Sequence, residues 1–148
     1  MVLNRGESGL IEDSRIERAL LNEAARFHGH LGPFLVLGLK AGLFANKVLG
    51  KDPFKTKAIV ETKLRPPYSC LIDGIQVVTG CTMGKGNIEV KDGEAILIRF
   101  TKGDKVLEMK LKREVLESLE DMRSGEDAER KALDVMLRPV NELFDIKL

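Results

Sequence analysis

Residues 87–111, NIEVKDGEAILIRFTKGDKVLEMKL, decide the fold class of this 148-residue chain. Alternating and β-branched residues within this stretch predict three strands, at residues 87–90, 95–100 and 106–111. Asp92-Gly93 and Lys102-Gly103-Asp104 separate the runs with the residue types that tight turns require. We therefore predict an antiparallel meander of three consecutive strands.

The residues before this stretch predict two helices. Apolar side chains recur at helical spacing from about Ser14 to Phe27, with Asp13 or Ser14 as the N-cap. A second helix is predicted to begin at Pro33 and to end at Gly50. Gly38 and Gly42 are four residues apart in it, so they lie on one face and would let another backbone approach closely.

A strand and a short helix are predicted between these helices and the meander. Lys57 to Leu64 alternates like a strand and ends at Pro66-Pro67. Ser69 or Cys70 can then open a helix over residues 71–78, which Gly80 would end in a left-handed conformation.

The C-terminal part is predicted to form charged amphipathic helices over residues 114–122 and 127–137, with a last short segment from Pro139. The apolar positions of these helices are expected to be core or dimer contacts: Val115, Leu119, Met122, Leu133, Met136 and Leu137. Because helices precede, interrupt and follow the sheet, we predict one α+β domain over residues 1–148, an antiparallel meander packed with N-terminal, inserted and C-terminal helices.

Composition limits the classes of partner. The 24 Lys and Arg residues nearly balance the 23 Asp and Glu residues, and the chain has one Tyr and no Trp. Neither net charge nor aromatic surface therefore favours nucleic-acid binding. The charged N-terminus lacks the apolar core of a secretion signal, and no stretch has the pattern of a membrane span, so we expect a cytoplasmic protein.

His28 and His30 are the only histidines of the chain, and they are separated by one glycine. An extended or turning backbone can present two such imidazoles to one ion, whereas a regular helix cannot. Gly29 and the Gly32-Pro33 pair favour that irregular backbone. The pair thus predicts a metal site, with helix capping and a solvated side chain as the structural alternative.

Cys70 and Cys81 are the only cysteines and flank the predicted 71–78 helix. Buried inert thiols are one interpretation. The other is chemical: unpaired amides at the helix N-terminus would stabilise a Cys70 thiolate, and Cys81 lies in a glycine-rich loop that contains Lys85.

That loop, residues 79–86, exposes backbone amides that can hold an anion, with Thr82 and Lys85 as further candidates. Its spacing does not fit the phosphate-binding loop of nucleotide enzymes, so no nucleotide is expected. Glu61, inside a predicted strand, can serve as a metal ligand or base, and an exposed surface glutamate is the alternative of equal weight. Asp73 is a further candidate for the pocket, or an acid that only complements the helix dipole. No residue is assigned a catalytic role from the sequence.

Three ordered motifs resemble the FmdE family, which takes its name from formylmethanofuran dehydrogenase: residues 27–33 (FHGHLGP), 38–42 (GLKAG) and 70–87 (CLIDGIQVVTGCTMGKGN). The resemblance extends over roughly residues 15–110. It implies an α+β core domain that forms homodimers, that occurs in methanogenic archaea and in bacteria, and that can associate with other subunits of the dehydrogenase. Many members add a C-terminal zinc-finger module; this chain has no cysteine after Cys81.

The same resemblance implies a pocket in which His28, His30, Cys70 and Cys81 match the histidines and later cysteines of the family. Many members have a further cysteine after His-Gly-His-Leu, where this chain has Gly32. The tungsten- or molybdenum-pterin chemistry of the parent complex resides in other subunits and is not expected here.

We therefore expect a metal-binding accessory protein or small metalloprotein, with zinc favoured because the predicted ligands mix nitrogen and sulfur. Two alternatives remain open at this point. One is a thiol redox protein that uses Cys70 and Cys81. The other is a non-catalytic module that binds an anionic ligand at helix starts and at the Gly84-Lys85-Gly86 loop.

Overall fold

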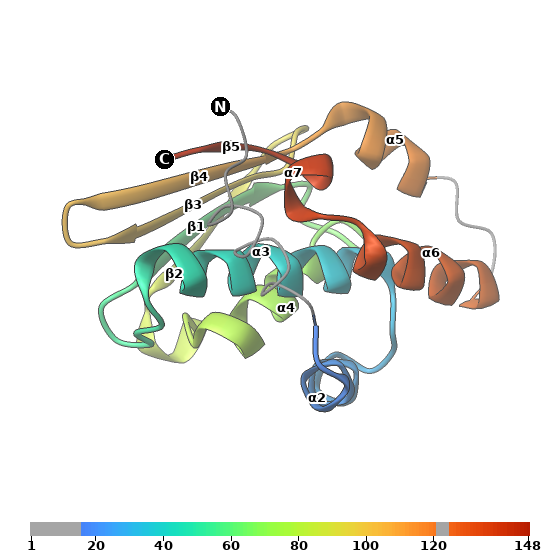
Figure 1. The fold of residues 1–148 in the computed structure, drawn as a ribbon, viewed down its shortest axis with the longest axis horizontal. Coiled ribbons are helices and arrows are strands. Elements are labelled where there is room, and N and C mark those ends of the chain that lie inside the picture. The colour runs from blue at the N-terminus through green and yellow to red at the C-terminus, as the bar shows by residue number, and fades with distance from the viewer. Residues whose placement is uncertain (1–15, 121–124) are drawn as a thin grey trace.

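The computed structural model describes residues 16–120 and 125–148, which form a five-stranded sheet with helices packed on it (Figure 1). In chain order its elements are α2 (Arg18–His28), α3 (Pro33–Leu49), β1 (Lys57–Thr62), α4 (Cys70–Thr79), the 3-10 turn η1 (Met83–Lys85), β2 (Ile88–Asp92), β3 (Leu97–Lys102), β4 (Lys105–Leu111), α5 (Arg113–Glu120), α6 (Gly125–Leu137), α7 (Val140–Leu143) and β5 (Phe144–Lys147). The predicted α+β class is confirmed.

The strand order is β2-β1-β3-β4-β5, so the predicted meander is correct only for the β3–β4 hairpin. β2 does not pair with β3. It pairs in parallel with β1, with Val60 opposite Val90, and β3 pairs antiparallel on the other side of β1. The physical reason is that α4 crosses over between β1 and β2 and returns the chain in the same direction. β5, which was not predicted from the sequence, extends the sheet beside β4.

The core lies between the sheet and α3. Ala58, Val60 and Thr62 turn one face of β1 inward and are fully buried, as are Ile98 and Phe100 of β3. Figure 1 shows α3 beneath the sheet, with α4 beside it and α2 on the side away from the sheet. This layering is what brings the end of α2 to the start of α4.

The predicted helix bounds hold for α3 and α4. Pro33 occupies the first turn of α3, and Gly80 ends α4 with a φ of +77°. α2 begins at Arg18, later than predicted, and the expected caps Asp13 and Ser14 lie outside the described residues.

Small residues let α3 and α4 touch backbone to backbone. A Cβ atom on Gly38 would lie 2.0 Å from the carbonyl oxygen of Leu71, and one on Gly74 would lie 2.4 Å from that of Leu35. Gly42 likewise faces Val78. The close approach predicted for Gly38 and Gly42 is therefore confirmed, and it fixes α4 relative to α3.

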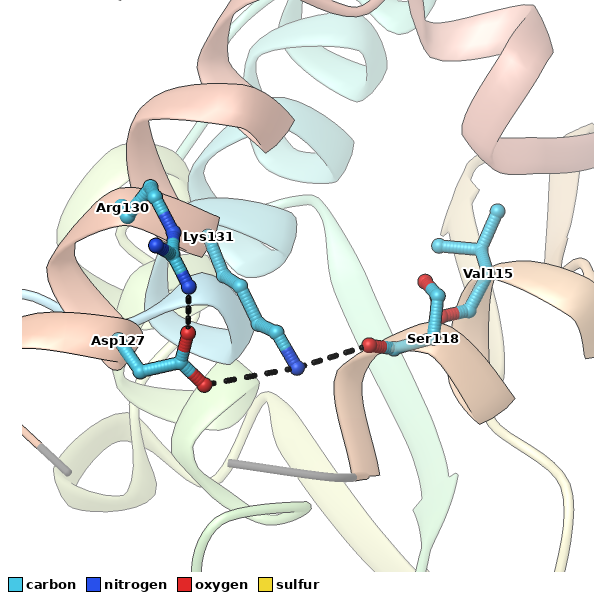
Figure 2. Close-up of polar contacts among 5 residues, drawn as sticks. All are labelled: Val115, Ser118, Asp127, Arg130 and Lys131. Atoms are coloured by element: carbon cyan, nitrogen blue, oxygen red, sulfur yellow. Dashed lines mark hydrogen bonds and ion pairs between the residues drawn. The ribbon is translucent and has the colours of Figure 1, made fainter. Parts of the chain in front are cut away.

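Two lysines bind carbonyl groups at helix C-termini. Lys131 of α6 donates to the carbonyl of Ser118 in α5 at 3.0 Å and lies 3.8 Å from Asp127, which also pairs with Arg130 (Figure 2). The buried Lys40 of α3 donates to the carbonyl of Met136 at 3.1 Å. These bonds satisfy carbonyls that a helix end leaves unpaired.

The predicted apolar positions of α5 and α6 divide into two groups. Val115 and Leu119 are buried in the core, and Met136 is partly buried. Leu133 and Leu137 are exposed, while Met122 lies outside the described residues. None of the described helices is long and apolar enough to cross a membrane.

Candidate functional site

A short polar contact joins His28 to Asp73, which are 45 residues apart in the chain. His28 is the last residue of α2, where Gly29 ends the helix with a φ of +113°, and Asp73 lies in the first turn of α4. His28 Nδ1 is 2.6 Å from Asp73 Oδ2, and the imidazole is only 12% exposed. The contact is a charge-assisted hydrogen bond that fixes the orientation of the ring.

His30 lies beside this pair on the irregular backbone that the sequence predicted. The ring centres of His28 and His30 are 5.1 Å apart, and the ring planes are tilted by 42°. His30 is exposed, and its ring lies over Gly32, where a Cβ atom would be 3.8 Å from Nε2. The two imidazoles therefore lie at one surface location, the loop between α2 and α3.

This arrangement fits part of a metal site. When Asp73 accepts the Nδ1 proton of His28, Nε2 of the same ring keeps a free lone pair, as in carboxylate–histidine–metal arrangements. Two imidazoles bound to one tetrahedral zinc ion at 2.0–2.1 Å have ring centres roughly 5 Å apart, which matches the observed separation. Two imidazoles are half of the four ligands that a tetrahedral zinc site requires.

Cys70 begins α4 on the same end of the helix as Asp73. The helix N-terminus was expected to favour a Cys70 thiolate, and this expectation is wrong in direction. Burial raises the pKa of the Cys70 thiol, and the nearby carboxylate of Asp73 raises it further. The amide of Cys70 is also occupied, since it donates to the carbonyl of Pro67 at 3.1 Å.

Cys81 lies beyond the opposite end of α4. The ten residues of that helix span about 15 Å at 1.5 Å per residue, so Cys81 is remote from His28 and His30. Its thiol is fully buried and donates to the carbonyl of Thr56 at 3.4 Å. Burial raises the pKa of the Cys81 thiol, while Thr79 and Lys85 oppose that shift.

The separation of the two cysteines also bears on the thiol redox alternative. A disulfide requires Cα atoms within about 7 Å, and the length of α4 keeps Cys70 and Cys81 farther apart than that.

Among residues 16–120 and 125–148, no three His, Cys, Asp or Glu side chains are placed to hold one metal ion.

Glu61 is not part of the cluster that contains His28. It lies on the face of β1 opposite to Val60 and Thr62, which face the helices. Its side chain instead packs over Gly93, where an added Cβ atom would lie 2.5 Å from the Glu61 Cγ.

The loop after α4 is held together by its own side chains. Lys85 donates to Thr82 Oγ1 through its backbone amide, at 3.3 Å, and through Nζ, at 2.9 Å. The amide of Thr82 donates to Asn87, and that of Met83 to Gln76. The amides of Thr82, Met83 and Lys85, which lie in the loop expected to hold an anion, are therefore already paired. The role of Asn87, which also donates to the carbonyl of Pro53, was missed because side-chain bonds across a loop leave no periodic signal.

The fold and the cluster define a class: an α+β domain in which an inserted helix orients a histidine of a His-Gly-His loop. The family model of FmdE, described as "Molybdenum formylmethanofuran dehydrogenase operon", matches residues 27–145. The chain belongs to this family. The match begins at Phe27 and thus includes the whole cluster of His28, His30 and Asp73.

A curated relative from Archaeoglobus fulgidus is named "Probable S-adenosyl-L-methionine-binding protein". It is 38% identical over 77 residues, which are 51% of this chain and 21% of that protein. The chain therefore spans about a fifth of the length of this relative.

Proposed function

We propose that this domain is a metal-binding accessory protein of the FmdE family, with zinc bound at the loop between α2 and α3. His28 and His30 are the proposed ligands, and Asp73 is the residue that orients His28. The observation that carries the proposal is the 2.6 Å contact between His28 Nδ1 and Asp73 Oδ2, because a carboxylate on one imidazole nitrogen directs the other toward a metal.

Cys70 is a candidate for a further ligand, since it starts the helix that carries Asp73. A bound cation would counteract the burial that disfavours its thiolate. Cys81 has no part in the proposed site, because its thiol is buried at the other end of α4.

Zinc would serve here as a Lewis acid or as a structural centre, and the donor set favours it over hard cations because it contains imidazoles. Family membership supports a role beside the other subunits of formylmethanofuran dehydrogenase, in one-carbon metabolism. We propose that the domain binds within or next to such a complex, and that it acts in the cytoplasm.

The direct test is metal analysis of untagged protein after exposure to zinc and removal of excess metal. The wild type is expected to retain zinc, His28→Ala to lose it, and Cys81→Ser to retain it as the matched control at the far end of α4. Absence of zinc from the wild type would refute the proposal. Equal zinc content in wild type and His28→Ala would refute the assignment of the ligand.

A second candidate follows from the name of the Archaeoglobus relative. If the shared segment contributes to cofactor binding, S-adenosyl-L-methionine would stabilise this domain against heat by mass action. A thermal-shift titration with that compound, with adenosine as the control ligand, decides between the two functions. No shift with either compound removes the cofactor-binding alternative.

A further inference from the structure

A cavity of about 400 Å³ lies at the carboxyl ends of β1 and β2. The two strands are parallel neighbours that are connected through α4, so their carboxyl ends meet at one end of the sheet, with Thr62 opposite Asp92. Crevices outside the carboxyl ends of parallel strands are a common position for ligands in sheets with helical connections. The volume is also within the range of small-molecule sites.

The lining of this cavity is divided by charge. The segment after β1 contributes Lys63, Leu64 and Arg65, whereas the end of β2 and the turn after it contribute Asp92 and Glu94. One wall therefore carries two cations and an apolar side chain, and the other wall carries two carboxylates. None of these residues belongs to the α2–α3 loop or to α4, so the cavity is distinct from the proposed zinc site.

The two cations of the cavity are positioned by Tyr68, the one tyrosine of the chain. Lys63 Nζ lies 4.7 Å from the centre of the ring, and Arg65 Cζ lies 5.3 Å from it, so both make cation–π contacts. The hydroxyl of Tyr68 donates to Glu120 at 2.7 Å, which fixes the ring. Two cations held on one ring are partly ordered before an anionic group binds, and this lowers the entropy cost of binding.

Lys63 also forms an ion pair across the cavity, with 3.6 Å between its Nζ and Glu94 Oε2. The side chain of Glu94 is 93% exposed, so this ion pair contributes little to stability. A ligand that carries both charges can replace it. Its carboxylate would bind Lys63 and Arg65, and its ammonium group would bind Glu94 and Asp92.

We propose that this cavity binds a small zwitterion in which a carboxylate and an ammonium group are joined by an apolar spacer. An anion without a positive group would place its charge next to Asp92 and Glu94, and a cation without a negative group would meet Lys63 and Arg65. A molecule with both charges pairs with both walls, which is the basis of its selection over either ion. The spacer would cover Leu64, whose side chain is 53% exposed.

Tyr68 supplies the measurement, because the chain has one Tyr and no Trp. Its intrinsic fluorescence should change when a ligand carboxylate draws Lys63 and Arg65 away from the ring. The full chain is titrated with ε-aminocaproate, and separately with caproate and with hexylamine, each of which keeps one of the two charged groups. We expect ε-aminocaproate to bind at least about 10-fold more tightly than either control compound. Isothermal titration calorimetry measures the same affinities independently.

Two variants test the two walls. Glu94→Gln removes an ammonium partner and should weaken ε-aminocaproate binding about 10-fold without weakening caproate binding. Arg65→Gln should weaken the binding of both compounds. Both side chains are exposed, so the variants are expected to fold, which circular dichroism checks. Asp104→Asn and Lys105→Gln are the matched controls, since these exposed charges lie at the β3–β4 turn, at the opposite end of β3, and their loss should leave both affinities unchanged.

Three results would overturn the inference. The first is no binding of ε-aminocaproate at millimolar concentrations, and the second is equal affinity for all three compounds. The third is unchanged ε-aminocaproate affinity in Glu94→Gln or in Arg65→Gln, because the zwitterion would then bind elsewhere. Zinc does not enter the experiment, so this inference and the proposed metal site can each fail without the other.

Discussion

Asp73 determines which nitrogen of His28 is free, and this makes it the most informative residue for mutation. We expect Asp73→Asn to lower zinc affinity by about 10- to 100-fold, because a neutral amide orients the imidazole less firmly and makes it less basic. Isothermal titration calorimetry measures the change. Glu61→Gln removes a carboxylate on the opposite face of β1 and should leave zinc affinity unaltered. Equal affinities for Asp73→Asn and wild type would contradict the role of Asp73.

Gly32 offers a gain-of-function test at the same site. Its φ of −140° suits any residue, and a Cβ atom there would lie 3.8 Å from His30 Nε2 in ordinary contact. Gly32→Cys would therefore add a thiolate beside the imidazole pair, and we expect zinc affinity to rise at least about 10-fold. Gly32→Ala adds the Cβ atom without a ligand and should leave affinity near that of the wild type. If both variants bind zinc equally, the site lies elsewhere.

At the scale of the elements, the close contact between α3 and α4 holds α4, which carries Asp73, in its place in the fold. Gly74→Ala would place a Cβ atom 2.4 Å from the Leu35 carbonyl, so the helices must separate. We expect a loss of about 1–3 kcal/mol in the free energy of unfolding, measured by urea denaturation. Gly84→Ala is the control, since nothing lies within 4 Å of its added Cβ atom. A Gly74→Ala protein as stable as the control would mean that the helices are not so closely packed.

The α3–α6 contact contains a buried cation whose effect depends on pH. Burial lowers the pKa of Lys40 from its ordinary value of 10.5. Between the lowered pKa and about 10.5, the unfolded chain binds the proton more strongly than the folded protein, so stability from this group rises with pH across that window. Lys40→Met lacks the titrating group. The free energy of unfolding of the wild type should therefore rise relative to that of Lys40→Met between pH 7 and about pH 10.5.

Chemical denaturation of both proteins at several pH values measures this difference. A difference that stays constant over the whole range would show that Lys40 titrates normally in the folded state. The variant also lacks the hydrogen bond from Lys40 to the Met136 carbonyl. Below the lowered pKa this loss is the same at every pH, so it does not produce the pH-dependent difference predicted above that pKa.

For the molecule as a whole, most local elements were predictable, whereas of the strand pairings only that of the β3–β4 hairpin was. Glycine and proline residues at the helix ends located α3 and α4 correctly, because capping and φ preferences act on single residues. The position of β2 depends instead on the crossover through α4, which no turn residue encodes, so consecutive pairing was the wrong default. β5 was missed because four residues carry too little alternation to register as a strand.

The candidate site shows the same division. The irregular backbone at Gly29 and the clustering of His28 with His30 follow from local sequence. The 45-residue reach from His28 to Asp73 depends on how α2 packs against α4, and sequence order alone cannot reveal it. Cys81 illustrates the reverse case, since the family resemblance implied that it shares a pocket with His28 and His30, and the length of α4 separates it from them.

Because the two cysteines are buried to different extents, the rates at which their thiols react can report how often the core opens. The Cys81 side chain is fully buried in the main core, whereas Cys70 is only partly buried at the start of α4. A small alkylating reagent in native buffer should therefore modify Cys70 first, and Cys81 only when the core opens. Mass spectrometry over time would resolve the two rates, and the slower one would report core opening at a cysteine that the protein already contains. Equal rates would mean that the strands around Cys81 open as readily as the surface of α4.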